Sequence, residues 1–89
     1  MAVSVIPTPC RFVLYHFVAD PHGPILSRPA LVTSVRSDGR VNIAVFFEPG
    51  DSEHGLGTSP QNFDNFRLNI EERSYEAKHP GTWSWPPRV

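Results

Sequence analysis

Apolar and polar residues alternate along this chain in short runs, a pattern typical of β-strands rather than helices. The first run, residues 11–18, is rich in aromatic and β-branched side chains and ends at the turn-forming cluster Asp20-Pro21-His22-Gly23-Pro24. It therefore predicts a strand with a definite end. Apolar residues occupy both of its alternating faces, so we expect both sides to be covered.

The clearest local signal lies in the middle of the chain, where two β-prone runs, 30–37 and 40–48, are joined by Asp38-Gly39. A two-residue Asp-Gly loop predicts a hairpin with a type I′ turn, because both central residues need positive φ and these two tolerate it. Counted back from this turn, the register pairs Val32 with Val45 and Leu31 with Phe46.

This register gives the hairpin two different faces, since paired residues point the same way. The apolar face, which we expect to form the core, carries Val32, Val41, Ile43, Val45 and Phe47. The mixed face carries Leu31, Thr33, Val35, Asn42, Ala44 and Phe46. Its apolar end, at Leu31 and Phe46, would be adhesive if left bare. We expect the C-terminal tail or a second subunit to cover it.

The chain changes character after the hairpin. Residues 48–62 are polar and turn-rich, and a loop of this length in a small domain either binds something or is disordered. Both interpretations stay open. Residues 66–71 alternate between apolar and polar, which predicts a half-buried strand. Residues 71–78 are expected to form one helical turn or a loop.

Both tryptophans lie near the end, in Gly81-Thr82-Trp83-Ser84-Trp85-Pro86. An indole can bury about 150–250 Å², so this tail is expected to belong to the fold. It predicts a short strand over 82–85 with both indoles on one face, ended by Pro86-Pro87. The Gly-Thr-Trp-x-Trp-Pro ending resembles that of small proteins, of unassigned activity, from tailed bacteriophages and prophages. The resemblance implies a source and no particular activity.

These elements predict one all-β domain over residues 1–89, built from four to five short strands. We expect a small antiparallel barrel, SH3-like in size, or a curled sheet. Ten prolines and six glycines limit the length of any helix. Exposed sheet edges favour a homo-oligomer. The single cysteine, Cys10, has no partner for an internal disulfide, so stability must come from packing or assembly.

The net charge limits the classes of partner that we expect. At −1 the chain lacks the broad positive field of a non-specific duplex binder, so nucleic acid is not an expected partner. No stretch reaches the roughly 20 apolar residues of a membrane span, and residues 1–9 lack the features of a signal peptide. We expect no membrane partner and a place in the host bacterial cytoplasm, with the virion as the alternative.

No residue pattern specifies a reaction. The four histidines have no zinc-like spacing, and no nucleophile motif is present. We therefore expect no catalytic residue, no metal and no cofactor. His16, inside the first strand, is expected to be a packed or edge histidine rather than a ligand.

A weak signal indicates phosphate binding. The segment 55–59 offers backbone donors and two hydroxyl groups, and nearby arginines would add charge. A solvated loop is the alternative interpretation. Tryptophan rings would stack on a base if they were exposed, although such rings are more often core. The candidate ligand-binding residues are Arg36, Arg40, His54, Gly55, Gly57, Thr58, Ser59, Arg67, Trp83 and Trp85.

Two classes of function follow. The first is a phage-encoded, non-enzymatic binding protein that sequesters a small, phosphate-containing, nucleotide-derived molecule or blocks a host defence protein. The second is a virion structural protein, such as a capsid decoration or head-tail connector protein. The absence of catalytic motifs, the arginine and aromatic content and the long glycine-containing loop favour the first. An enzyme acting on a nucleotide is a remote third option without an identifiable base or nucleophile.

Overall fold

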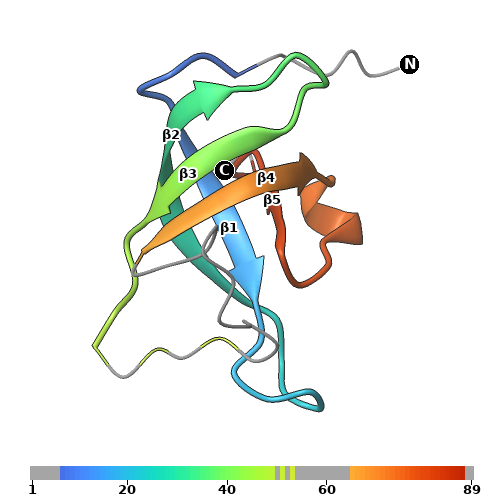
Figure 1. Ribbon diagram of the computed structural model, residues 1–89. Coiled ribbons are helices and arrows are strands. Elements are labelled where there is room, and N and C mark those ends of the chain that lie inside the picture. Colours follow the sequence, from blue (N-terminus) through green and yellow to red (C-terminus); the bar gives the residue numbers. More distant parts are fainter. Residues whose placement is uncertain (1–6, 50, 52, 54–64, 88–89) are drawn as a thin grey trace.

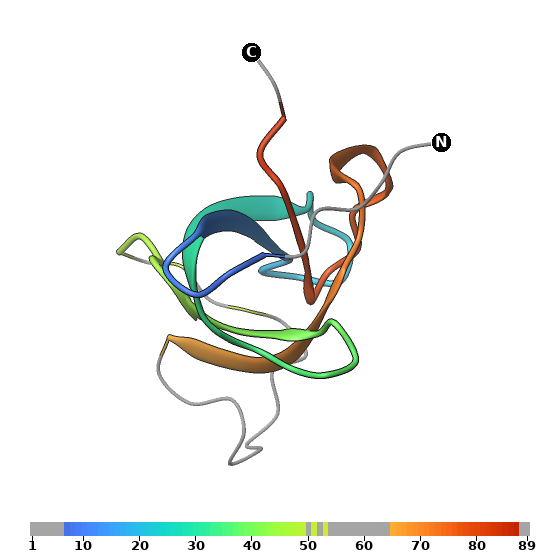
Figure 2. The ribbon, with the colours of Figure 1, turned by 90° about the horizontal axis from the view of Figure 1, so that it is seen from above.

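The computed structural model describes residues 7–49, 51, 53 and 65–87, and its five strands close into a barrel (Figure 1). Seen from above, the strands wrap around a common centre (Figure 2). The elements are β1 (Phe12–Phe17), β2 (Leu26–Val35), β3 (Val41–Val45), β4 (Phe66–Glu72), the 3-10 turn η1 (Tyr75–Ala77) and β5 (Thr82–Ser84). The predicted small all-β barrel is confirmed, in its closed form rather than as an open curled sheet.

The C-terminal strand completes the barrel. β1 pairs with β2 along its whole length and also with β5 at residues 14–16. On its other side β5 pairs with the end of β4 at Glu71 and Glu72. That last pair runs parallel, so the barrel is mixed and not purely antiparallel. Closure removes the free sheet edges on which the expectation of oligomerisation was based.

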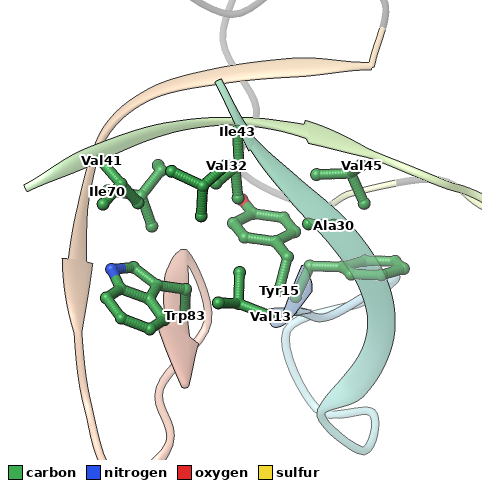
Figure 3. Close-up of a cluster of buried hydrophobic side chains, with 10 residues drawn as sticks. Val13, Tyr15, Ala30, Val32, Val41, Ile43, Val45, Ile70 and Trp83 are labelled. Atoms are coloured by element: carbon green, nitrogen blue, oxygen red, sulfur yellow. The ribbon is translucent and has the colours of Figure 1, made fainter. Parts of the chain in front are cut away.

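Apolar side chains fill the interior (Figure 3). Trp83 has no exposed surface, and its indole lies among valines and isoleucines from the other strands. The tail therefore belongs to the fold, as predicted. Leu26, Val35, Phe47 and Trp85 are partly buried and pack against this centre. The buried cluster consists of Val13, Tyr15, Phe17, Ala30, Val32, Val41, Ile43, Val45, Ile70 and Trp83.

The central hairpin forms, but its turn differs from the predicted type I′ turn. Gly39 has φ of +89°, whereas Asp38 is not among the residues with positive φ. The Gly39 N–H donates to the Arg36 carbonyl at 3.0 Å, and the Arg36 N–H donates to the Arg40 carbonyl at 2.8 Å. The loop therefore has three residues, with a type I turn followed by a left-handed glycine. The Asp38 carboxylate accepts the Arg40 N–H at 3.0 Å, which stabilises this form.

The register of the hairpin moves accordingly. The longer turn shifts it by one residue, and a bulge between Val32 and Ser34 shifts it by one more. Val32 therefore pairs with Ile43, not with Val45 as predicted. Two single shifts restore the alternation, so the strand residues of the predicted core face are buried. Val35, which was predicted on the mixed face, instead packs against the core, because the bulge turns its side chain inward.

A second bulge interrupts β4. Asn69 has φ of +61°, and its N–H donates to the Asn42 side chain at 3.1 Å. Strict alternation would bury Phe66 together with Ile70. Instead Arg67 and Ile70, three residues apart, are both buried, and Phe66 is left exposed.

Among the described residues no helix is long and apolar enough to cross a membrane.

Candidate functional site

The residues expected to bind a ligand lie in three separate places. Arg36 and Arg40 flank the hairpin turn, at one end of β2 and β3. Arg67 is buried on β4, and Trp83 is in the core. Trp85 follows β5 and is half-buried. The remaining candidates lie outside the described residues, namely His54, Gly55, Gly57, Thr58 and Ser59.

Arg40 borders an open hollow of about 470 Å³ together with Asp38, Gly39, Glu71 and Glu72. Its guanidinium lies 3.8 Å from the Asp38 carboxylate and 3.6 Å from that of Glu71. Three carboxylates and one guanidinium make this lining acidic, which repels a phosphate. The hollow is thus a poor match for the ligand chemistry expected of Arg40.

Arg67 takes part in an internal network. Only 3% of its side chain is exposed, and its Nε donates to Glu53 Oε1 at 3.0 Å. The guanidinium lies 5.1 Å from the centre of the Phe47 ring. The Tyr15 hydroxyl donates to Glu53 Oε2 at 2.6 Å. Burial, and then this carboxylate, raise the pKa of Tyr15, so the hydroxyl stays protonated and keeps donating.

A second arginine binds the chain close to Glu53, at the start of the connection between β3 and β4. Arg28 donates from Nε and Nη2 to the two carboxylate oxygens of Asp51, at 2.8 and 3.0 Å. This bidentate contact lowers the pKa of Asp51. Through these ion pairs, Asp51 and Glu53 attach the start of the β3–β4 connection to the barrel. Sequence analysis missed them, because nothing in the local sequence links a carboxylate to an arginine 14 or 23 residues away.

His16 is a packed histidine, as predicted. It has no exposed surface, and its Nδ1 and Nε2 each lie 2.8 Å from a serine hydroxyl, on Ser27 and Ser84 respectively. Burial, and then the positive charge of Lys78, lower the pKa of His16 to about 4. A substrate has no access to this buried group. Within the described ranges, no three histidine, cysteine or acidic residues gather as a metal site would require.

The two tryptophan rings contact each other. Their ring centres lie 5.6 Å apart in an edge-to-face arrangement. Among the described residues neither indole N–H has a hydrogen-bond partner, and both are buried. Trp83 therefore presents no free ring face on which a base could stack, and Trp85 presents only part of one.

The outer surface carries a continuous apolar area that spans four strands. Phe12 pairs with Leu31, Leu31 with Ala44, and Ala44 with Phe66, so these four residues form one row. A second row runs beside it, because Leu14 pairs with Pro29 and the Phe46 N–H donates to the Pro29 carbonyl at 2.9 Å. We call the two rows together the aromatic strip: Phe12, Leu14, Pro29, Leu31, Ala44, Phe46 and Phe66.

Three phenylalanine rings stand out from this strip. Phe12, Phe46 and Phe66 are 58%, 51% and 39% exposed, and the first two rings lie 6.0 Å apart. Of the two covers expected for Leu31 and Phe46, the tail is ruled out, because Trp83 is inside the barrel and Phe46 is 51% exposed; cover by a second subunit stays a prediction. The expectation that both faces of β1 are covered holds at His16 but fails at Phe12. An apolar area that the described residues leave exposed is typical of a surface that contacts another molecule.

Comparisons of this chain with known protein families, with characterised proteins and with solved structures find no significant match. The aromatic strip and the internal ion pairs therefore have to be interpreted from their own chemistry.

Proposed function

We propose that this chain is a non-enzymatic binding protein that docks another protein chain on its aromatic strip. The observation that carries the proposal is the strip itself, with three exposed phenylalanine rings on an otherwise tightly packed small barrel. Aromatic side chains dominate the energetics of protein interfaces, and their exposure to water is unfavourable unless a partner removes it.

The geometry favours a protein partner over a nucleotide. A nucleotide pocket would need free ring faces beside free arginines. The Trp83 ring is buried, Arg67 is engaged with Glu53, and Arg40 lies among carboxylates. The loop that was expected to supply backbone donors falls outside the described residues. Sequestration of a small phosphate-containing ligand therefore stays a prediction.

The phage-like tail suggests the setting for this role. We propose that the protein acts in the cytoplasm of a bacterial host, where it blocks a defence protein. The homo-oligomer expected from the sequence would use the same strip. A role in the virion is the alternative, and it is favoured if the protein is found in purified particles.

Native mass spectrometry of the protein recovered from expressing or infected cells tests the proposal. We expect the 10.0-kDa chain to carry at least one further protein chain. Phe46→Glu should remove this added chain, because it places a charge in the strip. The matched control, Ala77→Glu, adds the same charge on η1 and should retain the complex. The proposal fails if the wild-type chain carries only a nucleotide-sized mass that Phe46→Glu leaves in place.

A further inference from the structure

The geometry points to a second copy of this chain as the partner of the aromatic strip, held in a two-fold symmetric dimer. This inference rests on the proposed function of the strip as a docking face. It assigns the occupant of that face and the symmetry of the contact, and it follows from the charge, the size and the surroundings of the strip.

The charge of the strip suits contact with itself. In a two-fold symmetric dimer the same patch lies on both sides of the interface, so a charged group near the symmetry axis faces the identical group of the other copy. All seven side chains of the strip are uncharged. Arg28 on β2 pairs with the buried Tyr15 and therefore lies on the opposite face from the strip, where Asp51 engages it. The strip residues of two copies can therefore meet without like-charge repulsion, whereas a charged patch on a partner would find no complementary group within the strip.

The size of the strip fits a weak dimer. The exposed fractions of the three rings together equal about one and a half phenylalanine side chains. At about 150–250 Å² for each buried aromatic side chain, this is ~220–370 Å² per copy. Two copies then bury roughly 450–750 Å² from the rings alone, and the four smaller residues add to it. The ring contribution is below the ~1,200 Å² of a standard interface, as in weak, reversible complexes.

The closed barrel leaves side-chain contact as the route to self-association. Small β-proteins often associate by pairing free edge strands. Here every strand has a hydrogen-bonded neighbour on both sides, as the closed strand order requires. The parts of the barrel that the structure describes can thus meet a second copy through their outer faces, and the strip is the apolar one.

Sedimentation equilibrium of the purified full chain tests the dimer. We expect a dissociation constant on the order of 10–100 µM, typical of a small apolar interface. The average mass should rise with concentration from 10.0 kDa towards twice that value and stop there. Phe46→Glu and, independently, Phe12→Glu should each raise the dissociation constant at least about tenfold. Ala77→Glu on η1, which lies away from the start of β4 (Figure 1), should leave it unchanged.

Three results would overturn the inference. They are a wild-type chain that stays monomeric up to about 1 mM, a mass that keeps rising beyond two copies, and a dimer that both strip variants leave intact. Far-UV circular dichroism of each variant shows whether the barrel is retained. If the recovered complex contains a different protein while the purified chain stays monomeric, the inference fails and the proposed function stands. If neither association is found, both fail.

Discussion

At the level of single residues, the buried imidazole of His16 couples folding to pH. A neutral ring between two hydroxyl groups is satisfied, because a hydroxyl can donate to one nitrogen or accept from the other. Burial, and then Lys78, lower the pKa of His16 from 6.5 to about 4. The folded pKa therefore lies below the unfolded one. The resulting stabilisation is complete above about pH 6.5 and is lost as the pH falls towards 4.

We expect the free energy of unfolding, measured in urea, to drop by up to about 3 kcal/mol between pH 7 and pH 4 because of His16. His16→Gln should flatten this slope, although the variant is less stable at neutral pH. The exposed His22 provides the control, since His22→Gln should keep the wild-type slope. Identical slopes in the wild type and His16→Gln would contradict the assignment.

The two tryptophans should differ when truncated. Trp83 has no exposed surface, so Trp83→Ala is expected to cost about 3–5 kcal/mol of unfolding free energy. Trp85 is only half-buried, and Trp85→Ala should cost less, about 1–3 kcal/mol. Urea denaturation measures both values. A larger loss for Trp85 than for Trp83 would mean that their places in the fold are reversed.

At the level of elements, Gly39 tests the three-residue hairpin loop. A Cβ at this position would meet no atom within 4 Å, so the cost of a side chain comes only from φ of +89°. Gly39→Val should therefore cost about 1–2 kcal/mol, or roughly 4–16 °C in melting temperature. Gly39→Asn should cost less, because asparagine tolerates this conformation. An unchanged melting temperature in Gly39→Val would contradict the observed turn.

The ion pairs that attach the β3–β4 connection to the barrel give a second test. Glu53→Gln removes the negative charge beside the buried Arg67 and should destabilise the fold by about 3 kcal/mol. Glu48→Gln serves as the control, because Glu48 is 70% exposed and lies 3.8 Å from Arg28. An exposed ion pair of this kind contributes under about 1 kcal/mol. Equal losses in the two variants, measured by thermal melting, would rule out the internal network.

The strands were predictable because alternation and the Asp-Gly signal are local properties. The turn type was not, since the same dipeptide suits loops of two or three residues; in the observed three-residue form the Asp38 carboxylate accepts the Arg40 N–H. The bulges at Thr33 and Asn69 depend on the neighbouring strands. Sequence analysis found Leu31 and Phe46 in the strip, but it missed Phe12 and Phe66 because their positions require the registers of β1 and β4.

At the level of the whole molecule, aromatic side chains fall into two groups. Tyr15, Phe17 and Trp83 are enclosed by the barrel, and the phenylalanines of the strip are on its outer surface. Closure of the barrel encloses the first group in the core. It leaves the strip on the outside, where none of the described residues covers it. Dimer formation would stabilise the folded state by mass action. The melting temperature of the wild type should therefore rise with protein concentration, and that of Phe46→Glu should not.

Hydroxyl-radical footprinting, read by mass spectrometry at low and high protein concentration, tests this division of the aromatic residues most directly. In dilute solution Phe12, Phe46 and Phe66 should be oxidised readily. Trp83 should be protected, although a free indole reacts faster than a phenyl ring. At high concentration the three phenylalanines should become protected as well. Rapid oxidation of Trp83, or slow oxidation of the phenylalanines in dilute solution, would contradict the account.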